Sequence, residues 1–315
     1  MSKLAVIALG GNAIIRGDER GTIQQQNKNS SDTIHNLTYL LKEGYNLVLS
    51  HGNGPQVGNI LLRNDAGEEK YDIPQMPLDI CVADSQGGIG YMLEKMLKNI
   101  LKEEGIDREV ITIVTQVVVS KDDPAFDNYT KRVGKLYSKK EADELSERKG
   151  WTFKKSPKRA DAWRRVVPSP KPIKIMNDRI IKDLVNSGVI VIAAGGGGVP
   201  VYYDEKEMLQ PLEAVIDKDA ASSLLASNIG ADEFYILTDV PYVYSNFGTP
   251  EQEIIELINK EQIQKMIKKG AFGEGNMLPK IEAALRFVEN GGEKSVITEA
   301  SKLENRKYGT RITLH

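Results

Sequence analysis

The sequence is poor in cysteine and begins with only a short apolar run. Cys81 is the single cysteine in 315 residues, so no intrachain disulfide can form, which is typical of proteins from reducing compartments. The apolar run over residues 4–9 is too short for a signal-peptide core and far too short to span a bilayer. We therefore expect a cytoplasmic protein that does not enter membranes.

The chain has no excess of charge of either sign. It carries 42 Lys and Arg against 44 Asp and Glu, which gives a formal net charge of −2. This balance provides no overall positive field for nucleic acid or an anionic membrane, so neither is an expected partner. An anionic small-molecule ligand would have to be attracted by a local group of cations.

Several common catalytic and nucleotide-binding motifs are absent. The sequence contains no GxxxxGK[ST] and no GxGxxG, which excludes a P-loop and disfavours a Rossmann dinucleotide site. It also lacks the protein-kinase HRD and DFG motifs and the GxSxG elbow of serine hydrolases. His35, His51 and His315 are scattered, and Cys81 has no partner at ligand spacing, so no metal-ligating residues are predicted. His51 is predicted to be a packing or turn residue rather than a catalytic base.

The sequence does contain short apolar strands that alternate with amphipathic helices. The apolar runs that predict strands cover residues 4–9, 45–50, 110–119, 189–194, 234–239, 294–298 and 310–314. Helical spacing of apolar residues predicts helices around 34–41, 89–101, 180–184 and 281–288. The second of these helices is expected to follow the sequence DSQGG. This order indicates an α/β fold with a mainly parallel sheet and helices on both faces.

One segment breaks the alternation. Residues 121–165 are polar and basic, contain both tryptophans, and show few signs of a buried strand. Such a segment cannot extend the central sheet, so we interpret it as an inserted, protruding subdomain that could act as a lid. The alternative is a surface excursion without a role.

Glycine clusters follow three of the predicted strands. They are Gly10-Gly11-Asn12, Gly52-Asn53-Gly54 and Gly195–Gly198. The carboxyl ends of parallel strands share one edge of the sheet, and ligands bind at that edge. Glycine lets backbone N–H groups approach an anion closely, and nearby helix N-termini favour negative charge. The clusters therefore predict an anion site, against the alternative of simple turn chemistry.

Three lysines are candidates to bind phosphate oxygens at such a site. Lys131 lies in YTKRVG, Lys218 in DKD and Lys280 in GNMLPK, and lysine is a compact point charge suited to phosphate. The alternative for each is a solvated surface position, as for most of the 42 Lys and Arg. Thr238 and Asp239 follow a predicted strand, where they could hold part of a nucleotide or simply form a turn.

A set of motifs carries a resemblance to a known family. In chain order they are ALGGNAI, SHGNGPQVGN, MPLDICVADSQGGIGY, TQVVV, VVPSPKP, GGGGVPV, EAVIDKDAAS, LTDV, GNMLPKIEAALRFV and GTRI. Together they resemble the carbamate kinases, a branch of the amino acid kinase family, over residues 4–313. The resemblance implies a three-layer αβα sandwich over residues 1–315 with the small protruding subdomain. Its substrate side would lie in residues 1–210 and its nucleotide side in 211–315.

The same resemblance implies an activity. Carbamate kinases transfer a phosphoryl group reversibly between ATP and carbamate, giving ADP and carbamoyl phosphate, with Mg²⁺ held mainly by the nucleotide phosphates. They are usually homodimers, and most serve ATP synthesis in the catabolism of arginine or related compounds. We expect each of these properties here.

The resemblance also assigns roles to individual residues. The residues expected to face carbamate and the transferring phosphoryl group are Gly10, Gly11, Asn12, Gly52, Asn53 and Gly54. The expected catalytic residues are Lys131, Lys218, Asp219 and Lys280, with Asp219 orienting the lysines. The expected nucleotide contacts are Gly196, Gly197, Lys218, Thr238, Asp239, Val240, Tyr244, Ala271, Gly275, Met277 and Lys280. Asp217 is expected to do no more than help begin a helix.

The sequence departs from the family pattern near the nucleotide edge and in the subdomain. Asn276 stands where a serine is usual, Val82 and Asp84 interrupt a usual CGAMSQG, and residues 128–132 and 159–162 differ from their usual forms. Two alternatives therefore remain: a kinase of the same family acting on another small carboxylate, and a silent paralogue that binds nucleotide or carbamoyl phosphate. Retention of all three lysines argues against the second.

Overall fold

A mainly parallel sheet forms the centre of the molecule. The computed structural model describes residues 2–16, 19–156, 159, 161–272, 277–305 and 307–315. Among these residues, eight strands form the main sheet in the order β15-β17-β16-β12-β1-β2-β9-β3. Only the pairing of β16 with β17 is antiparallel. The strands of this sheet are β1 (Leu4–Leu9), β2 (Asn46–His51), β3 (Val110–Thr112), β9 (Ile190–Ile192), β12 (Glu233–Leu237), β15 (Leu257–Asn259), β16 (Lys294–Thr298) and β17 (Thr310–Thr313).

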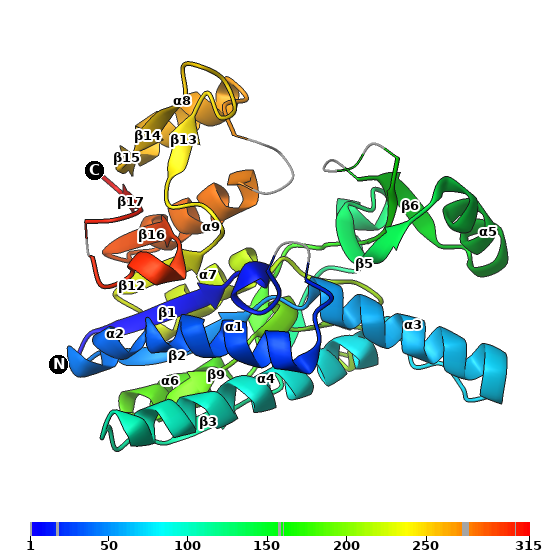
Figure 1. The fold of residues 1–315 in the computed structure, drawn as a ribbon, viewed down its shortest axis with the longest axis horizontal. Helices are drawn as coiled ribbons and strands as arrows, with labels where there is room; N and C mark the ends of the chain where they lie inside the picture. Colours follow the sequence, from blue (N-terminus) through cyan, green and yellow to red (C-terminus); the bar gives the residue numbers. More distant parts are fainter. Residues whose placement is uncertain (1, 17–18, 157–158, 160, 273–276, 306) are drawn as a thin grey trace.

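Helices cover both faces of this sheet (Figure 1). Along β1, Ala5 and Ile7 face one hydrophobic cluster while Val6 and Ala8 face another, so the strand is apolar at every position. One face is covered by α1 (Ile23–His35), α2 (Thr38–Lys42) and α4 (Leu78–Glu103). The other is covered by α6 (Asp178–Asn186), α7 (Lys218–Ile229), α8 (Lys260–Lys268) and α9 (Met277–Glu289). The expected three-layer sandwich is confirmed.

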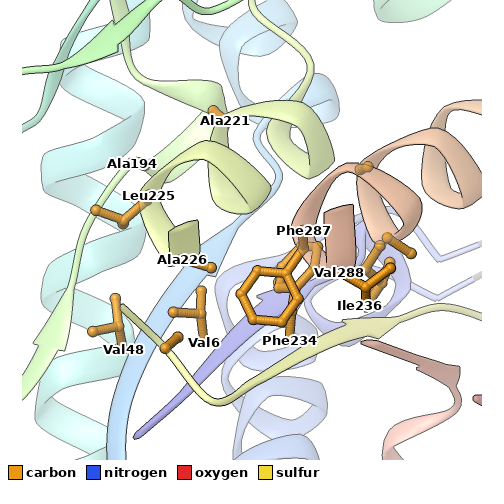
Figure 2. Close-up of a cluster of buried hydrophobic side chains, with 14 of the residues drawn as sticks. Val6, Val48, Ala194, Ala221, Leu225, Ala226, Phe234, Ile236, Phe287 and Val288 are labelled. Carbon is orange, nitrogen blue, oxygen red and sulfur yellow. The ribbon is translucent and has the colours of Figure 1, made fainter. Parts of the chain in front are cut away.

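Figure 2 shows the packing on the second of these faces. Phe234 on β12 and Phe287 on α9 place their ring centroids 5.6 Å apart, and both side chains are buried. Leu225 and Ala226 on α7 lie against the same sheet face. This packing holds α7 and α9 against the sheet, and those two helices carry Lys218 and Lys280.

The apolar run over residues 110–119 is not one strand, as the sequence predicted. It divides into β3 and β4 (Gln116–Val118), and β4 joins a smaller sheet in the order β11-β10-β4-β8. The break falls at Thr115, whose backbone N–H donates to the side-chain oxygen of Gln86 rather than to a neighbouring strand. The other strands of this sheet are β8 (Lys174–Ile175), β10 (Val199–Tyr203) and β11 (Leu209–Pro211), while β13 (Val243–Ser245) pairs with β14 (Glu253–Ile255).

Two predicted helix boundaries are also wrong. The segment around residues 34–41 is divided between α1 and α2, because the helix ends at Asn36 and restarts at Thr38. Helix α4 begins at Leu78, directly after Pro77, so DSQGG lies inside the helix rather than before it. Ser85 and Gln86 are therefore buried helical residues and not part of a loop.

The polar segment forms a unit with a sheet of its own. Strands β5 (Lys131–Tyr137), β6 (Thr152–Lys155) and β7 (Trp163–Val167) pair antiparallel in the order β5-β7-β6, and α5 (Lys139–Lys149) connects two of them. Figure 1 shows this unit projecting from the main body beside α3 (Gly54–Tyr71). As expected, it does not extend the central sheet.

Helix α3 supports the projecting unit at two places. A Cβ atom built on Gly58 would lie 1.9 Å from Cα of Gly134, so the backbones of α3 and β5 touch there. Farther along, Lys149 on α5 donates to Asp65 at 2.8 Å and to Glu68 at 3.0 Å, both on α3. The contact leaves room for no side chain at Gly58, and the pair of Lys149 with the buried Asp65 attaches α5 to the same helix.

We predict that Gly58→Ala detaches the projecting unit from α3. The new methyl group overlaps the β5 backbone, and overpacking of this kind costs about 1–3 kcal/mol. Unfolding in denaturant and proteolysis within residues 121–165 measure the effect. Gly67→Ala on the same helix is the matched control, because its Cβ would lie 3.8 Å from the nearest atom and a helical alanine stabilises. Equal stability and protease resistance of the two variants would contradict the prediction.

Candidate active site

The three glycine clusters meet at one edge of the sheet. They follow β1, β2 and β9, which are neighbours in the strand order. Each cluster lies against another part of the site: a Cβ atom on Gly10 would be 2.4 Å from the carbonyl oxygen of Leu237. A Cβ on Gly52 would be 3.5 Å from Cδ of Lys218. The expected shared edge is confirmed. At Gly10 there is no room for a side chain, whereas the distance at Gly52 is an ordinary van der Waals contact.

Two helices begin at this edge. Helix α3 starts at Gly54, directly after Asn53, and α7 starts at Lys218. Asp217 caps α7, because its Oδ1 accepts from the backbone N–H groups of Asp219 at 2.9 Å and Ala220 at 3.2 Å. The predicted helix-starting role of Asp217 is confirmed. The N-termini of both helices add partial positive charge to the site.

The most strongly charged part of the site is a carboxylate between two ammonium groups. Asp219 Oδ1 accepts from Lys218, and Asp219 Oδ2 accepts from Lys280 at 2.7 Å. All three side chains are buried. Lys218 and Asp219 belong to α7 and Lys280 to α9, so the carboxylate joins two helices. The arrangement carries one net positive charge in a buried place, which suits an incoming anion.

Burial and ion pairing shift the pKa values of these three groups in opposite directions. Burial favours neutral Asp219, but the two lysines outweigh it and hold the pKa of Asp219 well below its usual range. Burial is also the largest effect on Lys218, and it lowers the pKa of that ammonium. For Lys280 burial is outweighed by Asp219 and further acids, including Asp239, so its pKa is raised. Asp239 is thus within electrostatic reach of Lys280.

Lys131 approaches from the projecting unit. It is the first residue of β5, and its Nζ donates to Asp217 Oδ2 at 2.8 Å. Both side chains are 29% exposed, so this pair is open to water in a way that the Asp219 pairs are not. The structure thereby brings all three predicted lysines to the two acids of the DKD sequence. The expectation that Asp217 does no more than help begin a helix is wrong, because it also pairs with Lys131.

The remaining nucleotide candidates extend away from these lysines. Thr238 and Asp239 follow β12, with Thr238 Oγ1 donating to Asp239 at 3.1 Å. They line a pocket of about 380 Å³ together with Arg16, Thr33 and Glu299. The positions of the other candidates are as follows: Val240 follows Asp239, Tyr244 lies in β13, Ala271 follows α8, Met277 begins α9, and Gly275 lies outside the described residues.

Two further nucleotide candidates, Gly196 and Gly197, lie against Asn53 in the loop after β2 and against the segment before α7. A Cβ atom on Gly196 would be 2.1 Å from Nδ2 of Asn53, and one on Gly197 would be 2.4 Å from the carbonyl oxygen of Ile216. Gly196 therefore contacts an expected acceptor residue, and Gly197 lies beside the segment that leads into α7. Gly10, Gly11 and Gly52 lie in the segments directly after β1 and β2, and Gly54 begins α3. For Asn12 only the backbone, in the turn Gly11–Ala13, is described.

His51 has the packing role that the sequence predicted. It is fully buried beneath Gly195, and burial lowers the pKa of its imidazole to about 4. The ring is consequently neutral at pH 7 and bonds to the carbonyl oxygen of Gly52 at 3.1 Å.

Within the described part of the chain, no three His, Cys, Asp or Glu side chains are grouped to hold a metal ion. Among the same residues, no helix has the length and hydropathy needed to cross a membrane.

Comparison with known proteins identifies the family. Residues 3–299 match the model of the amino acid kinase family. The chain is 45% identical to the carbamate kinase of Pyrococcus furiosus over 316 residues, which covers 99% of each chain. It superposes on the Giardia lamblia carbamate kinase bound to citric acid with a TM-score of 0.93 at 39% identity, covering 100% of this chain and 99% of the other. The same enzyme bound to AMP-PNP gives a TM-score of 0.90 at 40% identity, with the same coverage.

The chain therefore belongs to the amino acid kinase family. Within that family it is one of the carbamate kinases, since relatives with this activity match it over nearly its whole length. The expected fold, family and enzyme class are confirmed. The roles of the individual residues rest on the geometry described above, and they stay predictions.

We predict that Asp219→Asn destabilises the fold, because it leaves two buried ammonium groups without a carboxylate. Removing one member of a buried ion pair costs about 3–5 kcal/mol. Without Asp219 the pKa of Lys218 should fall further and that of Lys280 should drop below its usual value. The unfolded state then binds more protons than the folded variant, so the loss of stability shrinks as pH rises from 7 toward about 10. Denaturant unfolding of both proteins across this range measures the difference.

Asp217→Asn is the matched control for this prediction. It keeps the oxygen that caps α7 and removes only the charge that faces Lys131. Because that pair is partly exposed, the loss should stay below about 1 kcal/mol. If Asp219→Asn were no less stable than Asp217→Asn at pH 7, the buried carboxylate would not be the centre of the site.

Proposed function

We propose that this carbamate kinase transfers the phosphoryl group directly, in line, at the glycine edge of the sheet. The observation that carries the proposal is the pair of buried lysines on the two oxygens of Asp219. An oxygen of carbamate attacks the γ-phosphorus of ATP, a new O–P bond forms, and the bond to the β-phosphate oxygen breaks to release ADP. The reverse reaction makes ATP from carbamoyl phosphate.

The chemistry needs charge stabilisation rather than proton transfer. Carbamate is already an anion, so no base is required to create the nucleophile. The buried imidazole of His51 is neutral and bonded to backbone, which agrees with a site that contains no dedicated base. The barrier then falls through alignment of the two substrates and neutralisation of charge on the equatorial oxygens.

Each charged residue has a separate part in this proposal. Lys218 and Lys280 bind phosphate oxygens from α7 and α9, and Asp219 keeps both ammonium groups charged and fixed in place. Lys131 joins them from the projecting unit, so that residues 121–165 act as a lid over the site. Residues 1–210 then supply the acceptor side and residues 211–315 the nucleotide side.

Mg²⁺ fits this site only as a partner of the nucleotide. The described acids form no metal-binding group, and Asp219 already has a lysine on each oxygen. The ion would therefore be held mainly by phosphate oxygens and would supply further neutralisation of their charge.

That the Giardia lamblia relative was solved with AMP-PNP supports ATP as the nucleotide here. Net ATP synthesis in arginine catabolism and a cytoplasmic location stay predictions from sequence.

We predict that Lys218→Met loses most activity and stays folded. Loss of a key cation in phosphoryl transfer lowers the rate by roughly 10³–10⁵-fold, whereas methionine retains the stem that packs beside Gly52. The assay is ATP formation from ADP and carbamoyl phosphate, with and without Mg²⁺. Lys260→Met, which removes an exposed partner of Glu289, is the control and should retain activity. Near-normal turnover of Lys218→Met would exclude the proposed role.

We also propose that the chain forms a homodimer through the β3 end of the sheet. Within the described residues β3 pairs only with β9, which leaves its other edge open. Tyr91, Ile111 and Val114 are exposed there by 66%, 40% and 50%, and α4 contacts β3 closely at Gly90. An open edge beside exposed apolar side chains suits a second copy of the same surface.

Light scattering tests this assembly. The native protein should have twice the chain mass of 34.9 kDa, and Tyr91→Lys combined with Val114→Lys should reduce it to the single-chain mass. Phe247→Lys is the control, because Phe247 is 68% exposed and closely follows β13, which belongs to a separate sheet and lies across the molecule from β3 (Figure 1). A native protein of single-chain mass would rule the homodimer out.

A further inference from the structure

Ser85 fixes the orientation of the Asn53 side chain. Its hydroxyl lies 2.6 Å from the carbonyl oxygen of Val82, and Nδ2 of Asn53 lies 2.8 Å from the same hydroxyl. A carbonyl can only accept, so the Ser85 proton goes to Val82 and the Ser85 oxygen must accept from Asn53. Only the NH₂ end of the Asn53 amide can therefore face α4. Both side chains are buried, so water does not compete with these bonds.

Gln86 fixes the position of α4 relative to the glycine loop after β9. Its amide pairs with the backbone of Thr115 in both directions, donating at 3.1 Å and accepting at 2.9 Å. The Thr115 hydroxyl in turn accepts from the backbone N–H of Ala194 at 2.9 Å. Ala194 has φ of 51°, a left-handed conformation that needs such support outside glycine.

The loop held in this way also packs against Asn53. Gly196 touches the amide so closely that any Cβ there would overlap it. The Asn53 amide is thus contacted by a serine that fixes its direction and by a glycine that limits its movement. Adjacent residues of α4 control both restraints, since Ser85 bonds the amide and Gln86 holds the loop.

We propose that Ser85 is a positioning residue for the acceptor, acting through Asn53. This inference rests on the proposed function, in which Asn53 faces the carbamoyl group. That group presents both an N–H donor and a C=O acceptor, and an amide side chain recognises it only when its own donor and acceptor ends are not exchanged. Without the Ser85 hydroxyl, the buried N–H of Asn53 loses its partner and the amide is no longer held in one orientation.

The test is a double-mutant cycle on Ser85 and Asn53 with steady-state kinetics in the ATP-forming direction. Ser85→Ala should lower kcat/KM for carbamoyl phosphate by about tenfold, the effect of leaving a buried donor without its partner. The KM for ADP should stay within about twofold of the native value. In an Asn53→Ala background the further change Ser85→Ala should have almost no effect, because the amide through which it acts is gone.

Ser295→Ala is the matched control. Ser295 is fully buried on β16 and its hydroxyl bonds the carbonyl oxygen of Ala284 at 2.9 Å, so the variant loses a similar hydrogen bond away from the acceptor loops. It should lower thermal stability about as much as Ser85→Ala and leave both KM values unchanged. A loss of kcat/KM that is equally large with and without Asn53, or a parallel rise in the KM for ADP, would overturn the inference. A native enzyme that forms no ATP would instead refute the proposed function itself.

Discussion

A buried carboxylate shared by two buried lysines is the constraint on which the rest of the site depends. Two ammonium groups cannot be removed from water so close together without a counter-charge, and Asp219 supplies it with one oxygen for each. These bonds join the first turns of α7 and α9. Their hydrophobic faces, including Phe287 against Phe234, then hold those starting points in place. The apolar core and the charged site are thus two parts of one arrangement.

The glycines, which have no side chains, are the second feature that organises the site. Gly195 admits the ring of His51, and Gly196 admits the amide of Asn53. At each of these positions a functional or supporting side chain occupies the space that a Cβ would take. Glycine therefore does more here than permit turns, because it allows the loops after separate strands to pack directly against one another. The same principle applies where Gly58 and Gly134 join the projecting unit to α3.

Much of the fold could be predicted because its signals are local. Each signal lies within or directly beside the element that it predicts: the apolar run in β1, the helical spacing in α9 and the glycines after β2. The division of residues 110–119 could not be predicted, because a side chain from α4 takes the Thr115 N–H that a continuous strand would have used. Ser85 was missed for a related reason: a polar residue beside two glycines suggests a loop, and only the packed structure reveals a buried helical serine.

The two carboxylate oxygens of Asp217 accept hydrogen bonds from different parts of the molecule. Oδ1 receives the backbone N–H groups at the start of α7, whereas Oδ2 receives Lys131 from the projecting unit. Lys131 can consequently exchange its carboxylate for a phosphate without uncapping the helix that carries Lys218. Breaking the Lys131 pair would therefore leave the hydrogen bonds that cap α7, and with them the position of Lys218, unchanged.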